Sequence, residues 1–181
     1  MNNKLINHLR KLLIKDNYLD LNTFLNVILY DKNFGFYNSI KFKKNELIGQ
    51  KGHFITGPEI SQLFGELVGI WILQLCRENN FHNINLLELG PGKGTLMKDI
   101  LRIFLQQKET IKIKVHLLEF SKVLKSYQKE NLKNYCHELK WYENIFKIKD
   151  HLNNDPIIII SNEFFDCLPI NQYIFRKIKN I

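Results

Sequence analysis

At 181 residues the chain has the size of one domain, and an apolar content of 45% is enough for a hydrophobic core. No apolar run reaches 18 residues, so we expect no membrane span. The net charge is +8, but 22 of the 26 basic residues are lysines scattered along the chain, without an arginine stripe or an aromatic–basic alternation. The distribution of charge therefore argues against a nucleic-acid partner.

Cys76, Cys136 and Cys167 lie far apart, which predicts reduced thiols and no metal site.

Residues 1–80 form the first of two expected parts, a helical N-terminal extension. Residues 1–15 are basic and amphipathic, as in a transit peptide, but their leucines make one continuous stripe, so we predict a folded helix. A polar, glycine-containing interruption follows near residues 43–57. Pro58 and Glu59 have the composition of a helix start. The helix after them is expected to place a stripe in the core, namely Phe64, Leu67, Val68, Trp71 and Leu75.

Residues 81–181 form the second part and alternate apolar runs with helical stretches, which predicts an α/β fold with a parallel sheet. The last strand contains four consecutive isoleucines, which is typical of a strand buried on both faces. A further β segment is possible at 172–178. The expected strands are 84–88, 113–119, 138–142 and 157–161, with helices at 95–107 and 122–134.

The segment 88–96, Glu-Leu-Gly-Pro-Gly-Lys-Gly-Thr-Leu, joins the first of these strands to a helix. Gly90, Gly92 and Gly94 allow a tight turn and a close approach of the backbone to a ligand. The carboxylate of Glu88 would repel a pyrophosphate and suits a cationic guest, such as the amino-acid end of S-adenosylmethionine. The dinucleotide fingerprint is the nearest alternative, but it needs its third glycine one residue later, where Thr95 stands.

Further acidic residues close the later strands, and ligands of open parallel sheets bind at these strand ends. Glu119 ends the second strand 25 residues after Gly94, in the place expected for an acceptor of ribose hydroxyl groups. It also precedes Ser121, a possible helix cap, so part of its role is expected to be local. Glu143 follows the third strand, where the adenine amino group is commonly accepted, and Asn144 is the alternative acceptor.

The segment 162–169, Asn-Glu-Phe-Phe-Asp-Cys-Leu-Pro, follows the fourth strand and carries Asn162, Glu163 and Asp166. Enzymes that methylate base amino groups often have a proline-containing motif here, and both of its prolines are missing. Two carboxylates suit a cationic acceptor such as a guanidinium, which they bind in a planar fork. Alternatively, the segment is a turn whose two phenylalanines only pack.

Together these segments resemble the MidA-like family of S-adenosylmethionine-dependent methyltransferases. The resemblance runs from about residue 25 to 172, over 29–37, 54–66, 88–96, 116–121 with Gln128, and 162–169. His53, Lys32-Asn33 and Cys167 depart from the family pattern, and none lies in the glycine loop. The resemblance implies a class I methyltransferase (Rossmann-like) sheet with S-adenosyl-L-methionine as cofactor. Its mitochondrial members are protein arginine methyltransferases that assist assembly of respiratory complex I.

By this resemblance, the cofactor is held by Glu88, the three glycines and Glu119. Glu143 is a further candidate for the cofactor, and Asn162, Glu163 and Asp166 are our candidates for the acceptor side. It implies a protein substrate, possibly a complex I subunit, in the bacterial cytoplasm or the mitochondrial matrix. The rivals are a nucleic-acid amino-methyltransferase and a non-catalytic assembly factor that retains the fold.

A class I sheet has seven strands, and this chain supplies four with one possible addition. We therefore expect a sheet truncated after strand 4, with the C-terminal half missing or supplied in cis or in trans. The isoleucine strand would then lack a neighbour, which predicts poor solubility or inactivity of the chain alone.

Overall fold

The structure is a computed structural model, and it describes residues 3–38, 55–107, 110–136 and 138–175. Contacts divide the chain into two compact units, residues 1–39 with 166–181 and residues 40–165, and each is described by itself. The boundary that we expect near residue 80 remains a proposal. The interruption predicted near 43–57 falls almost wholly outside the described residues.

The larger unit contains a parallel four-stranded sheet of order β3-β2-β1-β4. All four predicted strands are present: β1 (Asn83–Leu89), β2 (Lys112–Leu118), β3 (Glu138–Tyr142) and β4 (Ile157–Ser161). After β1 the chain builds the sheet outward through β2 and β3, then crosses back to add β4 on the other side of β1. The strand order therefore reverses between the carboxyl ends of β1 and β4, the position at which open α/β sheets bind ligands.

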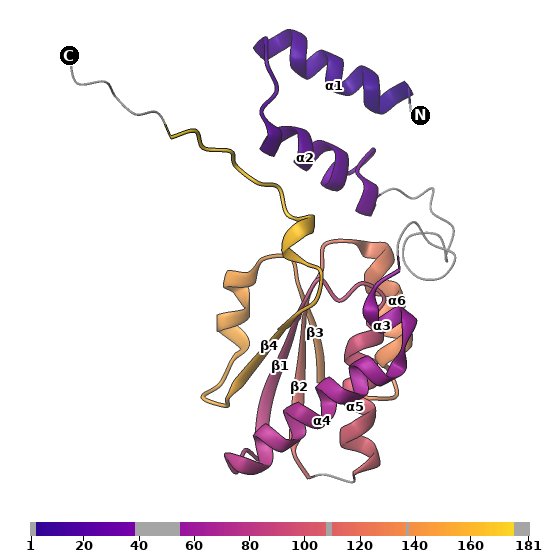
Figure 1. Cartoon of the computed structure of the whole chain (residues 1–181), viewed down its shortest axis with the longest axis vertical. Coiled ribbons are helices and arrows are strands. Elements are labelled where there is room, and N and C mark those ends of the chain that lie inside the picture. Colours follow the sequence, from indigo (N-terminus) through magenta and orange to yellow (C-terminus); the bar gives the residue numbers. More distant parts are fainter. Residues whose placement is uncertain (1–2, 39–54, 108–109, 137, 176–181) are drawn as a thin grey trace, which may run out of the picture. The chain divides into compact units, whose positions relative to one another are not determined.

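Helices cover both faces of the sheet (Figure 1). On one face, α4 (Gln62–Glu78) and α5 (Thr95–Gln106) pack with β1 and β2 in the main core, which also includes Leu132 of α6 (Lys122–Leu132). On the other face, η2 (Ile145–His151) places Ile148 against Leu87, Leu118 and Tyr142. The short α3 (Gly57–Ile60) precedes α4, with Pro58 in its first turn as predicted.

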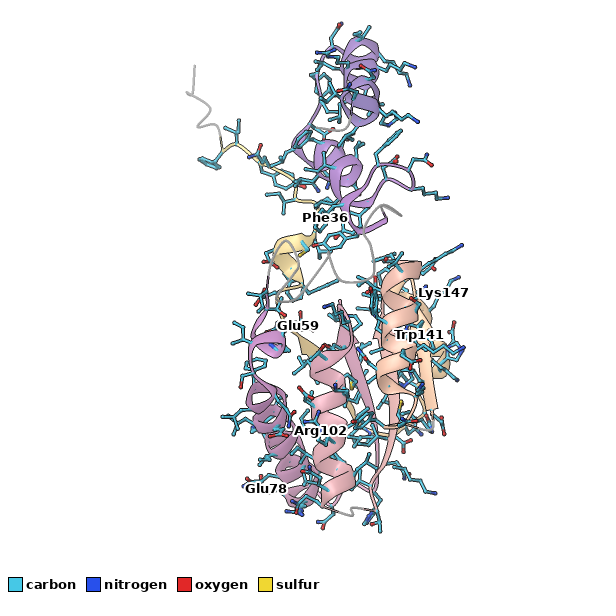
Figure 2. All side chains as sticks on the ribbon, turned by 90° about the vertical axis from the view of Figure 1, so that its right-hand side faces the viewer. Phe36, Glu59, Glu78, Arg102, Trp141 and Lys147 are labelled. Atoms are coloured by element: carbon cyan, nitrogen blue, oxygen red, sulfur yellow. The ribbon has the colours of Figure 1, made fainter. Side chains whose placement is uncertain are left out.

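The predicted core stripe of α4 is confirmed at Val68, which packs against the core, but it is wrong at three of its five positions. Phe64, Leu67 and Trp71 are 40%, 57% and 60% exposed. The buried face instead carries Gly65, Gly69, Ile72, Leu73 and Cys76. Both faces of this helix are apolar, and the one with glycines permits the closer approach to α5. Arg102 lies where α5 adjoins α4 (Figure 2). It ion-pairs with Glu66 of α4 and with Asp99 of its own helix.

The prediction that the isoleucine strand is buried on both faces is also wrong. Along β4, Ile158 and Ile160 pack against the main core, whereas Ile157 and Ile159 are 39% and 56% exposed. Among the described residues, β4 pairs with β1 alone.

The described part of the smaller unit contains two helices, two single 3-10 turns and a segment without regular secondary structure. The predicted N-terminal helix is confirmed as α1 (Asn3–Asp16), followed by α2 (Leu21–Tyr30) with Asp20 as its N-cap. The turns are η1 (Phe36–Asn38) and η3 (Phe165–Cys167), the latter beginning at the last residue of the larger unit. Residues 172–175 form no strand, so the possible β segment at 172–178 is absent from its described part. No helix in the described ranges is long and apolar enough to cross a membrane.

Candidate cofactor site

The glycine loop lies at the switch point between β1 and β4. Gly90, Gly92 and Gly94 all have left-handed backbone conformations, with φ of 63°, 54° and 79°. Other residues adopt this conformation only under strain, so the three glycines are required by the turn itself. A Cβ on Gly90 would lie 2.5 Å from Cδ2 of Phe164, in the segment after β4. The loop then leads into the N-terminus of α5, whose first amides have no partner within the helix.

Two helices brace this loop from outside. From α6, Gln128 Nε2 donates to the carbonyl of Gly92 (2.8 Å), and Asn131 Nδ2 donates to that of Lys93 (2.9 Å). From α3, the carboxylate of Glu59 accepts a hydrogen bond from the Thr95 hydroxyl and lies 3.5 Å from Lys93 Nζ. Glu59, predicted only as a helix-start residue, therefore also connects α3 to the loop.

Glu119 is buried at the end of β2, and both of its carboxylate oxygens accept hydrogen bonds. Oε1 accepts from the backbone N–H groups of Phe120 (2.9 Å) and Ser121 (2.8 Å). Glu119 therefore has the predicted local role, since it binds the backbone just before α6. Oε2 accepts from Gln128 Nε2 (3.0 Å). Burial raises the pKa of Glu119, while the hydrogen bonds from Ser121, Gln128 and Phe120 oppose the shift. These bonds fix the carboxylate and leave Oε2 with spare acceptor capacity.

Gln128 is fully buried and connects three parts of the site. Its amide nitrogen bonds both Gly92 and Glu119, and its amide oxygen accepts from Trp141 Nε1 of β3 (2.8 Å). One side chain thus links the glycine loop, the carboxylate after β2 and the third strand. In the sequence it stood out only as a point of family resemblance, because nothing local signals a buried glutamine with three partners.

Glu88 is the most unusual group of the site. It is 3% exposed, and its Oε2 accepts no hydrogen bond from any described residue. Burial, with the neighbouring Glu119 charge, raises the pKa of Glu88 to about 8. A buried, unpaired carboxylate oxygen is costly unless a cation or a donor binds there. The site therefore fits a guest with a positively charged end.

Glu143 directly follows β3, where the sequence predicts it. Its carboxylate is exposed and ion-pairs with Lys125 Nζ of α6 at 2.7 Å, which lowers its pKa. The alternative, Asn144, caps η2 by accepting from Phe146 N at 2.9 Å. The role of either residue toward adenine stays a prediction.

An open pocket of about 470 Å³ adjoins Glu143, lined by Lys125, Lys140, Trp141, Tyr142, Glu143, Asn144, Lys147 and His151. No residue of the glycine loop lines it.

The three residues predicted to face the acceptor follow β4 in the chain. Glu163 has a φ of 50°, a left-handed conformation that costs a non-glycine residue roughly 1–3 kcal/mol. Such strain is common at functional positions. Of the two phenylalanines, Phe164 is partly buried and packs against the core cluster that contains Ile148, whereas Phe165 is 68% exposed. Asn162 and Glu163 belong to the larger unit, whereas Asp166 belongs to the smaller one.

Comparison with known proteins decides the family. The sequence profile of a family described as putative S-adenosyl-L-methionine-dependent methyltransferase matches residues 67–179, more than half of the chain. The chain belongs to this family. That result confirms the resemblance drawn from the motifs.

Curated relatives carry a more specific name. The chain is 32% identical to the protein arginine methyltransferase NDUFAF7, mitochondrial, of Danio rerio, over 96% of this chain and 44% of that protein. It is 34% identical to the Homo sapiens protein of the same name, over 71% of this chain and 34% of that protein. The chain thus spans less than half the length of these relatives.

A solved structure confirms the fold. A protein from Burkholderia thailandensis, described as a "likely methyl transferase" and solved with S-adenosyl-homocysteine bound, superposes with a TM-score of 0.74. The match covers 92% of this chain and 42% of that one, at 18% identity. The predicted α/β methyltransferase fold, with helices preceding the sheet, is therefore correct for the described part.

Proposed function

We propose that this chain binds S-adenosyl-L-methionine at the glycine loop and belongs to an enzyme that methylates protein arginine residues. The observation that carries the cofactor assignment is the unpaired, buried oxygen of Glu88 beside three left-handed glycines. The family and the named relatives support the same cofactor and point to a protein acceptor.

Within this proposal, the chain's own residues bind and orient. Glu88 ionises to face the cationic amino-acid end, and Glu119 Oε2 accepts from a ribose hydroxyl. The three glycines let the backbone approach the ligand without a Cβ in the way. Gln128 fixes the position of the loop relative to Glu119, because it donates hydrogen bonds to both. When bound, the cofactor supplies an electrophilic methyl group on a sulfonium.

On the acceptor side, Glu163 and Asp166 are proposed to bind the guanidinium and to polarise one of its nitrogens, with Asn162 as a further hydrogen-bonding group. Alignment of the nitrogen with the methyl carbon then accounts for most of the rate. The strained backbone of Glu163 supports a functional role for this position. Methylation of an arginine of a complex I subunit is the acceptor that the family resemblance implies.

Location and partners are part of the same proposal. The named relatives are mitochondrial, so we propose the mitochondrial matrix for a eukaryotic source and the cytoplasm for a bacterial one. Because the relatives are more than twice as long, we propose that turnover needs the polypeptide corresponding to their remaining length, in cis or in trans. A non-catalytic assembly factor would bind the cofactor and the partner without transferring the methyl group.

The function is tested by incubating the protein, alone and with the remaining portion of a full-length relative, with isotope-labelled S-adenosylmethionine and total cell protein or RNA. We expect label in arginine residues, located by mass spectrometry. Glu163→Gln should lower turnover at least tenfold with little change in cofactor affinity, because the lost charge faces the acceptor. Label found in RNA and in no protein would contradict the arginine assignment.

A further inference from the structure

The N-terminal unit contains a tightly built turn, residues 30–37, whose role the proposed cofactor site does not explain. Asp31 Oδ1 accepts from the backbone N–H groups of Asn33 (2.8 Å) and Phe34 (2.9 Å). Gly35 N donates to the carbonyl of Asp31 (2.8 Å), and a Cβ on Gly35 would lie 2.6 Å from that oxygen. Only glycine fits there, so the local sequence fixes the distance between Tyr30 and Tyr37.

The turn brings two tyrosines to one cysteine. The rings of Tyr30 and Tyr37 are stacked, with centroids 5.6 Å apart and an interplanar angle of 25°. The Tyr30 hydroxyl donates to the backbone carbonyl of Cys167 (2.7 Å), and the Tyr37 hydroxyl donates to its Sγ (3.0 Å). Both bonds are partly buried, and they join positions 137 and 130 residues apart in the chain.

The electrostatics of the cluster keep the Tyr37 hydroxyl in the donor state. Burial raises the pKa of Tyr37 further above its ordinary value of 10, and the hydrogen bond with Cys167 and the charges of neighbouring groups, including Asp166, add to the shift. Tyr37 therefore remains protonated throughout the physiological range. A bond to the backbone together with a bond to the side chain restrains both the path of the η3 turn and the rotation of Cys167.

We propose that Tyr30 and Tyr37 are positioning residues, which clamp η3 and thereby fix Asp166 for the acceptor. The clamp itself rests only on the contacts given above, whereas its effect on the acceptor rests on the proposed function.

The clamp is tested in the full chain with Tyr30→Phe and Tyr37→Phe, which retain the rings and remove only the hydroxyls. The readout is the rate at which iodoacetamide alkylates Cys167, followed by peptide mass spectrometry. We expect this rate to rise about fivefold in each variant, as the loss of one hydrogen bond allows. Cys136 is the internal reference, and the fully buried Cys76 reports any global unfolding. Tyr18→Phe, at a position 70% exposed, is the matched control and should change nothing.

The second readout separates the clamp from the proposed function. With the complemented enzyme, both variants should lower kcat/KM for the acceptor about tenfold and leave the dissociation constant of S-adenosylmethionine unchanged. An unchanged Cys167 rate in both variants overturns the clamp. Faster alkylation with unchanged acceptor kinetics overturns its positioning role. Absence of cofactor binding by the unmodified chain contradicts the proposed function instead, and the alkylation test of the clamp still stands.

Discussion

Glu88 is buried, lies beside a second acid and has an unpaired oxygen, a combination that opposes folding. Its pKa of about 8 means that the folded protein prefers the neutral acid at pH 7. A cationic ligand reverses this preference, because it stabilises the carboxylate. Affinity for S-adenosylmethionine should therefore rise as the pH increases toward about 8, the pKa of Glu88.

Glu88→Gln provides the first prediction. Because the folded pKa lies above the ordinary 4.5, the stability linked to this group is fully present below pH 4.5 and is lost as pH rises through 8. Glutamine does not titrate, so the melting temperature of the variant should exceed that of the unmodified protein increasingly from pH 5 to pH 9. Cofactor affinity should fall at least tenfold, since the countercharge is gone. Parallel melting curves at every pH would argue against a buried, ionisable Glu88.

Substitutions at Gly92 and Glu119 form the second prediction. Gly92→Val places a β-branched residue at a φ of 54°, so calorimetry should show loss of cofactor affinity by more than tenfold. Glu119→Gln removes the charge but keeps an acceptor for the two backbone N–H groups, whereas Glu119→Ala leaves both N–H groups without this acceptor. Both Glu119 variants should weaken binding, but only alanine should also cost about 1–3 kcal/mol of stability. Unchanged affinity in the Gly92 and Glu119 variants alike would refute the cofactor assignment.

At the scale of elements, Gln128 couples the glycine loop to β2 and β3. Gln128→Leu removes all three hydrogen bonds and should weaken cofactor affinity about tenfold or more, measured by calorimetry. Trp141→Phe is the control, because it removes only the bond to the amide oxygen. If the coupling matters, the leucine variant should lose far more affinity than the phenylalanine variant. Equal losses would mean that general packing, and not the linkage of loop and acid, accounts for the effect.

The packing of α4 on α5 depends on glycines. A Cβ on Gly65 would lie 2.6 Å from Cβ of Asp99, and one on Gly69 would lie 3.0–3.1 Å from atoms of Ile100 and Ile103. Gly65→Ala should therefore lower the free energy of unfolding by about 1–3 kcal/mol despite alanine's better helix propensity, as denaturant titration would show. Leu67→Ala, on the exposed face of the same helix, should change it by less than about 1 kcal/mol. A larger loss for Leu67→Ala would indicate that this face is covered in solution.

For the whole molecule, periodicity and turn chemistry were enough to predict the four strands and the two helices between them. The glycines at 90, 92 and 94 needed no tertiary information either, because their spacing is itself a backbone requirement. The α4 prediction is wrong at Phe64, Leu67 and Trp71 because both faces of that helix are apolar, and the face with the glycines is the one that packs closely against α5. The prediction that the isoleucine strand is buried on both faces is wrong because only alternate residues of β4, on one face of the sheet, meet the core.

Other features depend on contacts between distant residues and have no local signature. The hydrogen bonds from Gln128 to Gly92 and from Tyr37 to Cys167 join residues that are 36 and 130 positions apart, and hydrophobic patterns do not predict them. Glu59 has the composition of an ordinary capping residue, yet its side chain binds the glycine loop. The sequence thus predicts where a ligand binds better than it predicts what holds the binding groups in place.

The central claim is that Glu88, the glycine loop and Glu119 bind S-adenosylmethionine. Calorimetric titration of the chain with this ligand at pH 7, repeated in buffers of different ionisation enthalpy, tests it most directly. We predict one binding site, with net release of protons as Glu88 ionises against the cationic ligand, and no such release in Glu88→Gln. Absence of binding heat at millimolar ligand, or binding with the same proton release in both proteins, would contradict this account.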